Sequence, residues 1–124
     1  MNLPPYAATL GLAVTPGEDA PVFTMPFTDE VVGRPGFVHG GAIGGLLEMA
    51  AVGALIQAIG DDSVEIKPIN LTIDFMRGGR DKPTFASGSV TRLGKRIANV
   101  HVTAWQDDPD RAIAAARMNF LLKR

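Results

Sequence analysis

Cysteine is absent from this chain, and histidine occurs only twice, at His39 and His101. The absence of cysteine excludes disulfide frameworks, thiolate zinc sites and cysteine nucleophiles. Two histidines argue against a multi-histidine metal site, so we expect no metal. A strong charge of either sign is also lacking, because the formal net charge is −1 over 124 residues. We therefore expect no general attraction to nucleic acid or to an anionic membrane surface.

The first residues of the chain carry no basic group ahead of their apolar run, and they read poorly as a signal peptide. This pattern predicts a cytoplasmic protein. The length of 124 residues predicts one domain, spanning residues 1–124, that is large enough to bury a core.

One stretch, from Gly36 to Gly60, is almost entirely apolar. Between residues 42 and 59 the only charged side chain is Glu48, and the only other polar one is Gln57. Apolar side chains recur there every three or four residues, which is the period of an α-helix. They are Ile43, Leu46, Leu47, Ala50, Ala54, Leu55 and Ala58. A stretch of about 18 residues that contains three glycines and a carboxylate is a poor membrane span. We therefore expect the central helix of a packed core.

Glu48 and the start of this helix suggest a site. A carboxylate in a core helix is protonated, paired or open to a ligand pocket, because burying it as an unpaired charge costs several kcal/mol. The helix is preceded by His39, Gly40 and Gly41. The first N–H groups of a helix have no internal partner and suit an oxyanion, and glycine lets a ligand approach them. The alternative interpretation is a simple tight turn, with Glu48 paired to a buried arginine.

Two short apolar runs precede the helix, at residues 8–14 and 21–27, on either side of a turn-like segment at residues 15–19. They predict a β-hairpin. Residues 28–38 are rich in glycine and predict a loop that leads into the helix.

After the helix, apolar and polar side chains alternate with the period of two that is typical of strands. In residues 69–75 the odd positions are apolar and the even positions polar, so we expect a half-buried strand. The alternation returns at residues 98–104 and more weakly at 84–93. Residues 111–124 have the alanine content of a helix, but apolar side chains also recur there at every second position. The short turns between the preceding runs favour an antiparallel meander, so we expect a strand. The chain thus predicts an α+β fold, one long helix wrapped by a curved antiparallel sheet. Because the helix is apolar nearly all round, we also expect self-association.

The run Gly36–Gly41 (GFVHGG), with Glu48 eight residues after Gly40, resembles the hot-dog-fold acyl-CoA thioesterases of the phenylacetate-degradation type. Residues 69–79 and 87–105 are similar to strands of that family, and the resemblance covers roughly residues 8–122. It implies a hot-dog fold, whose members pair into dimers with one continuous sheet. The dimers often pair again into homotetramers. The active site of such proteins lies at the dimer interface.

The resemblance also implies roles for individual residues. Glu48 takes the position of the catalytic carboxylate, as nucleophile or general base, and the Gly40 N–H that of the oxyanion donor. His39 would help to orient the site. The substrate would be an acyl- or aryl-acyl-CoA thioester, so coenzyme A is part of the substrate and no separate cofactor is expected. Basic residues in turns suit its phosphates. The residues expected to contact the substrate or its CoA portion are Gly41, Asn70, Arg77, Lys95 and Arg96.

Three positions depart from the family pattern. Gly33 stands where members commonly have Asn or Gln, and Val52 and Pro68 stand where a helper Ser or Thr is often found. We therefore expect either slow catalysis or substitution by another polar group, such as Asn70 of the partner subunit. The departures also fit an alternative function, that of a non-catalytic acyl-CoA-binding hot-dog protein.

Two further alternatives are weaker. The hydroxyacyl thioester dehydratases of the same fold use a histidine well before the helix acid, at a position where this chain has Arg34. The last alternative is a scaffold in which Glu48 is salt-bridged in the core. In that case its removal would destabilise the fold by roughly 3–5 kcal/mol.

Overall fold

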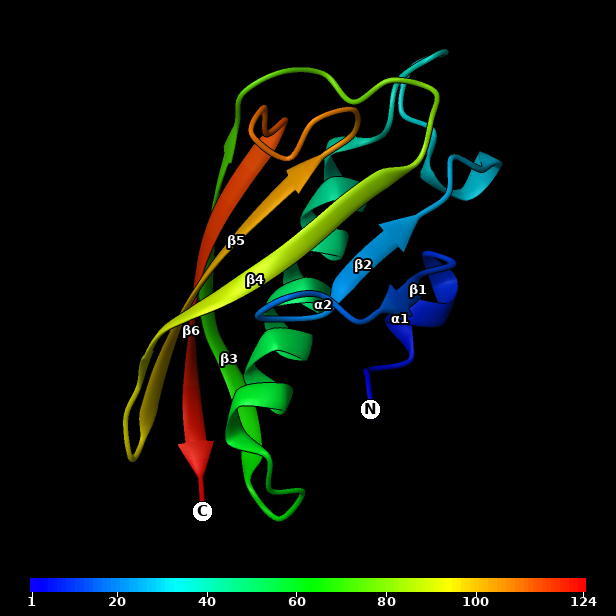
Figure 1. Cartoon of the computed structure of the whole chain (residues 1–124). Helices are drawn as coiled ribbons and strands as arrows, with labels where there is room; N and C mark the ends of the chain where they lie inside the picture. Colours follow the sequence, from blue (N-terminus) through cyan, green and yellow to red (C-terminus); the bar gives the residue numbers. More distant parts are fainter.

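A single long helix, α2 (Gly40–Ile59), runs through the middle of the molecule, and one antiparallel sheet wraps around it (Figure 1). The structure is a computed structural model, and it describes residues 1–124. The strands are β1 (Ala13–Thr15), β2 (Val22–Met25), β3 (Glu65–Phe75), β4 (Thr84–Leu93), β5 (Ile97–Trp105) and β6 (Ala114–Lys123). Two short helices, α1 (Tyr6–Thr9) and η1 (Asp29–Val31), precede α2.

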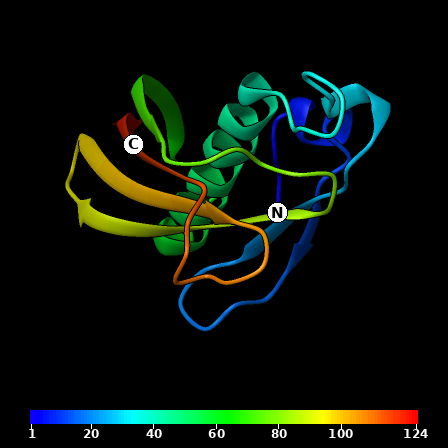
Figure 2. The same cartoon turned by 90° about the horizontal axis from the view of Figure 1, so that it is seen from above.

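The strand order in the sheet is β1-β2-β4-β5-β6-β3, so β1 and β3 are its two edges. Strand β3 follows α2 directly in sequence but pairs only with β6, the last strand. Seen from above, the sheet curves round one side of α2, with β3 (green) on one flank and the N-terminal segments (blue) on the other (Figure 2). Part of the helix surface therefore lies between two flanks that the sheet does not join.

Local signals define both ends of α2. His39 is the N-cap, and its Nδ1 accepts a hydrogen bond from the Gly41 N–H at 2.8 Å. Gly60 ends the helix in the left-handed conformation, with φ of 64°, and its N–H donates to the Ile56 carbonyl. A residue without a side chain is favoured there because positive φ crowds a Cβ atom.

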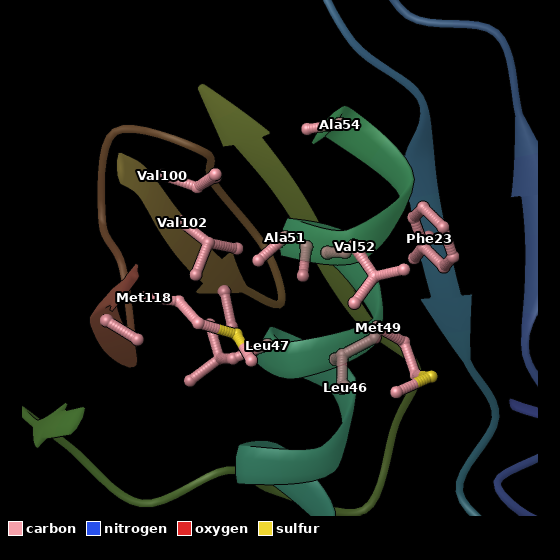
Figure 3. Packing of buried hydrophobic residues seen from close by; sticks show 14 of the residues in the cluster. Phe23, Leu46, Leu47, Met49, Ala51, Val52, Ala54, Val100, Val102 and Met118 are labelled. Atoms are coloured by element: carbon pink, nitrogen blue, oxygen red, sulfur yellow. The ribbon is translucent and has the colours of Figure 1, made fainter. Parts of the chain in front are cut away.

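The core is a cluster of 28 buried apolar residues, many of them from α2. Figure 3 shows helix side chains such as Leu46 and Leu47 between Phe23 of β2 and Val102 of β5. At Gly88 a Cβ atom would come within 2.9 Å of the Ala54 side chain, so the sheet approaches the helix very closely there. The helix is long and apolar enough to cross a membrane, but 72% of that span is buried inside the protein. It is the core helix.

The predicted α+β architecture is confirmed, including the long helix and the final strand. The prediction of a strand over residues 8–14 is wrong, because the structure places α1 at Tyr6–Thr9 and starts β1 only at Ala13. Pro4 and Pro5 open this helical turn, and each of their carbonyls accepts from the N–H group three residues further on, at Ala7 and Ala8 respectively. The hairpin itself exists, because β1 pairs with β2.

The prediction for the apolar face of β3 is wrong at two positions. Leu71 and Ile73 are half-buried, but Ile69 is 52% exposed and Phe75 is 57% exposed. A register shift between Pro68 and Asn70 leaves Ile69 without a partner on β6, which breaks the alternation. Proline has no N–H to donate to a strand ladder and is typical of edge strands and bulges. Phe75 is the last residue of the edge strand β3, and its ring lies beside the exposed start of α2 at Gly40.

Candidate active site

One line of residues along α2 is left incompletely covered at every position except the buried Val52, and we call it the helix seam. Its members follow one another at steps of three or four residues, so they lie on one face of the helix. They are Gly41, Gly45, Glu48, Val52, Ile56 and Ile59. Strand β3 borders the seam on one side, where a Cβ at Gly44 would lie 3.1 Å from Ile73. Helix α1 borders it on the other side, where a Cβ at Gly45 would lie 2.7 Å from Tyr6.

Glu48 is the only charged residue of α2, and it is half-buried in this seam. Its carboxylate takes part in no hydrogen bond or ion pair within the chain; the one ion pair in the structure joins Lys82 and Asp107. The alternative of a scaffold in which Glu48 is salt-bridged in the core therefore lacks the ion-pair partner that it requires. A half-buried carboxylate without a partner in its own chain needs water, a ligand or another chain to solvate or pair it.

The start of α2 offers one free donor. The Gly41 N–H is already bound by His39 Nδ1, and the N–H groups of Ala42 and Ile43 both donate to the His39 carbonyl, at 3.0 and 3.1 Å. The N–H of Gly40 has no acceptor in the chain, and Gly40 is exposed. Because the helix dipole adds partial positive charge at this N–H group, the group is suited to bind a developing negative charge.

The hydrogen bonds at the start of α2 give different roles to three predicted site residues, His39, Gly41 and Gly40. His39 acts as the N-cap, and because its Nδ1 accepts a hydrogen bond, a neutral His39 carries its proton on Nε2. Gly41 supplies the donor to that cap, and a Cβ at Gly41 would come within 2.9 Å of His39 Nδ1. The cap therefore uses the second donor of the helix and leaves the first, at Gly40, available.

Glu48 and Gly40 of one chain cannot serve one carbonyl group. They are eight residues apart on one helix, which separates them by about 12 Å along the axis at 1.5 Å per residue. A carboxylate that attacks a carbonyl carbon, or activates water for that attack, and a donor to the carbonyl oxygen must both lie within about 3 Å of the reacting group. A complete site of this kind needs groups from two chains.

Two cavities open along the helix seam, one on each side of Glu48. The first, of about 360 Å³, lies at the start of α2, where His39 and Gly41 face Tyr6 and Leu10 of the N-terminal segment. The second, of about 500 Å³, begins at Val52 and extends to the end of the helix. We call the second one the distal cavity. Glu48 lines neither cavity but lies between them along the helix, and both are of the size that small-molecule ligands occupy.

Asn70 lies on the outer face of the sheet, away from α2. Its side-chain oxygen accepts a hydrogen bond from Asn119 Nδ2 at 2.8 Å, and Asn119 in turn accepts from Asn99. These three amides form a ladder across β3, β6 and β5. The structure therefore does not bring Asn70 together with Glu48 of the same chain.

The predicted basic residues lie at two opposite ends of the sheet. Arg77 follows β3 near the start of α2 and lines a cavity of about 350 Å³ together with Arg80 and Arg111. Lys95 and Arg96 lie in the turn between β4 and β5 at the other end, and line a separate cavity of about 500 Å³. Further cations line that second cavity, namely Lys67, Lys123 and Arg124.

Sequence reasoning missed Lys67 and Lys123. They join Lys95 and Arg96 because the register of β3, β5 and β6 places the start of β3, the start of β5 and the end of β6 side by side. No local pattern gives this register. No three side chains of His, Cys, Asp or Glu gather anywhere in the chain in a way that could hold a metal ion.

A long helix held by a curved six-stranded antiparallel sheet, with a carboxylate in the helix and a free N–H at its start, is the architecture of the hot-dog thioesterases. Residues 28–121 match the family model described as the acyl-CoA thioesterase N-terminal domain. The chain belongs to this thioesterase family, which confirms the predicted family and enzyme class.

Solved structures support the same fold. A protein from Chromobacterium violaceum is 35% identical, with a TM-score of 0.78, and the match covers 97% of this chain and 84% of that one. A phenylacetic acid degradation-related protein from Ralstonia eutropha is 23% identical, with a TM-score of 0.82 and coverage of 98% and 92%. A Bacillus halodurans protein solved with CoA is 22% identical, with a TM-score of 0.83 and coverage of 96% and 78%. No curated protein matches the chain.

Proposed function

We propose that this protein hydrolyses an acyl- or aryl-acyl-CoA thioester to the free acid and coenzyme A, in a site built from two copies of the chain. One observation carries the proposal: α2 presents an unpaired carboxylate at Glu48 and an unpaired donor at Gly40, too far apart to act together within one copy. Family membership supports the reaction class. The solved relative that contains CoA supports the substrate class.

The edge strand β3 offers the surface for the second copy. It pairs with β6 on one side only, and Ile69, Phe75 and Met76 at or beside this edge are each at least 50% exposed. Unpaired strand edges with apolar side chains favour pairing with another chain. Two β3 strands paired antiparallel about a two-fold axis would set the start of one α2 against the middle of the other. Glu48 of one copy would then face Gly40 of the partner subunit.

The chemistry follows from these two groups. As general base, Glu48 takes a proton from water, whose oxygen attacks the carbonyl carbon, and the resulting oxyanion accepts a hydrogen bond from the Gly40 N–H. Collapse breaks the C–S bond, and the proton passes from Glu48 to the departing sulfur. As nucleophile, Glu48 would instead attack the carbonyl carbon directly and expel the thiolate, and water would then cleave the mixed anhydride. His39 is a positioning residue in both schemes, because it holds the neighbouring Gly41 donor.

The basic cavities would receive the phosphates of coenzyme A. Pairing through β3 brings the end of one copy that carries Lys95 and Arg96 toward the end of the other that carries Arg77. Guanidinium and ammonium groups from both copies could then meet one nucleotide. We further expect two such dimers to pair into a homotetramer, and we expect the protein to act in the cytoplasm.

A second candidate function is acyl-CoA binding without turnover, and the loop before α2 favours it. A Cβ at Gly33 would lie 3.0 Å from the Cα of His39, so the Asn or Gln that members commonly place there would be tightly packed against the backbone before the helix. Val52, the other helper position on the helix, is buried. The polar group that positions the thioester or water in relatives is therefore absent from these positions.

The decisive experiment measures release of free coenzyme A from a panel of acyl- and aryl-acyl-CoA thioesters. Wild type is compared with Glu48→Gln, which keeps the shape of the side chain but removes its charge. Glu18→Gln, on an exposed loop, is the matched control. Turnover that is lost only in Glu48→Gln, with folding retained, supports the thioesterase. Saturable binding of the same thioesters without turnover in wild type favours the binding protein.

A further inference from the structure

The distal cavity differs from the other cavities in its chemistry. Its walls are mostly aliphatic side chains from the second half of α2, the start of β3 and the first residues of the chain. The side chains that matter here are Leu3, Val52, Ile56, Ile59, Val64 and Ile66. No lysine or arginine lines it, and Asp61 and Asp62 lie at its far end. Such a space suits an apolar group and repels a phosphate.

This cavity begins at Val52, one helical turn beyond Glu48, and Glu48 does not itself line it. Val52 follows Glu48 by one turn of the same seam, about 6 Å further along the axis, and Ile56 by a second turn, at about 12 Å. An acyl group whose carbonyl lies at Glu48, and whose chain runs along the seam, would therefore meet Val52 first and Ile56 next. The other direction leads to the polar start of the helix at His39 and Gly41.

The far end of the cavity, beyond Ile56, is unfavourable for an alkyl chain. The Ser63 hydroxyl and backbone N–H both donate to Asp61 Oδ1, at 2.7 and 2.9 Å. These hydrogen bonds hold the pKa of Asp61 below its usual value, so this carboxylate stays charged. An alkyl chain that reached it would have to desolvate a charge.

We propose that the distal cavity holds the alkyl chain of a medium-chain aliphatic thioester, and that Ile56 sets the length of chain accepted. The roughly 12 Å from Glu48 to Ile56 corresponds to an extended chain of about eight to ten carbons. The inference rests on the proposed thioesterase function, because it uses Glu48 as the reference point of the carbonyl. It adds the substrate class and the specificity-determining residue to that function.

The experiment measures kcat/KM for straight-chain acyl-CoA substrates from acetyl to palmitoyl in four proteins. Ile56→Trp fills the cavity, and Ile56→Ala enlarges it. Val14→Trp is the matched control, because Val14 is a 41% exposed aliphatic residue of β1 outside the cavity. We expect a wild-type optimum near eight to ten carbons. Loss of space for two or three methylenes in Ile56→Trp should lower the ratio of decanoyl to butyryl turnover about tenfold or more.

Ile56→Ala should shift the optimum to longer chains, and Val14→Trp should keep the wild-type profile. Hydrolysis with the same chain-length profile in all four proteins would overturn the inference about the distal cavity, and the proposed thioesterase function would still stand. If Ile56→Trp does not fold, the shift in Ile56→Ala decides alone, and an unchanged optimum in that variant overturns the inference.

If wild type hydrolyses none of the substrates, the proposed function fails, and thermal stabilisation tests the cavity separately. Stabilisation that is stronger with octanoyl-CoA than with coenzyme A, and that loses this difference in Ile56→Ala or Ile56→Trp, supports the cavity in a binding protein. Equal stabilisation by coenzyme A and octanoyl-CoA in wild type overturns it.

Discussion

Replacing Gly40 by proline would remove one N–H group from the site with little other change. Gly40 is the first residue of α2, a position at which proline is favoured because its N–H is not needed by the helix. His39 before it has φ of −63° and ψ of 135°, which is the conformation that a following proline requires. A Cβ at Gly40 would meet only the Phe75 ring, at 3.7 Å, an ordinary contact.

The expected effects on stability and on activity are therefore opposite. Removing the backbone freedom of a glycine at a compatible position stabilises a protein by about 0.4–1 kcal/mol. Removing one oxyanion donor lowers kcat by roughly a hundred- to a thousand-fold, or about 2.7–4 kcal/mol in the barrier. Gly40→Pro should thus be at least as stable as wild type and almost inactive.

Urea unfolding and the release of coenzyme A would measure the two effects on the same preparations. Gly40→Ala is the control, because it adds the Cβ but keeps the N–H, and it should stay within a few-fold of wild-type turnover. A folded Gly40→Pro protein with wild-type turnover would refute the role of this donor. Equal losses in Gly40→Ala and Gly40→Pro would show that crowding beside Phe75, and not the N–H, is responsible.

Three further predictions concern stability, pH and assembly. Gly88→Ala should lower the free energy of unfolding by about 1–3 kcal/mol in urea titrations, because its Cβ would lie 2.9 Å from Ala54. The pKa of Asp61 is lowered by its hydrogen bonds from Ser63, so its contribution to stability is complete above the unfolded-state pKa and is lost as the pH falls through the folded-state value. Urea unfolding of Asp61→Asn should accordingly show a shallower loss of stability than wild type below about pH 4. Phe75→Lys should shift sedimentation toward the monomer, because it places a charge on the exposed end of β3.

The parts of the fold that could be predicted are those that local patterns specify. Helix α2 follows from the spacing of its apolar residues and from the glycine at its end. Strand β6 (Ala114–Lys123) was predicted against the helix propensity of its alanines, and the alternation of buried and exposed positions confirms it. The turn-forming residues between β4 and β5 and between β5 and β6 predicted that these strands form an antiparallel meander.

The errors arise where a distant partner decides the structure. The run around Leu10 is short, apolar and next to a turn, as expected for a strand, but α1 packs on Gly45 of α2, and the local sequence gives no sign of that contact. The exposure of Ile69 follows from a bulge that only the pairing with β6 defines. The helix seam depends on which strands form the edges of the sheet. The sequence could therefore identify Glu48 but not the seam in which it lies.

The same limit applies to the candidate site. Gly40 and His39 lie at the start of one helix and Glu48 follows on the same helix, so all three could be predicted from a single motif. Lys67 joins Lys95 only through the register of three strands, and no local pattern gives it. The distal cavity combines the first residues of the chain with the end of α2, so its existence could not be read from any one run.

The central claim, that one active site uses Glu48 of one copy and Gly40 of the other, can be tested by mixing two inactive variants. Glu48→Gln and Gly40→Pro chains are unfolded together in equal amounts, refolded and assayed for release of coenzyme A. Random pairing makes half of the dimers mixed, and each mixed dimer has one site with both groups intact, so about a quarter of wild-type activity should return. Mixed dimers that form, as separated by charge or by a tag, but have no more activity than the two parents would contradict the shared site.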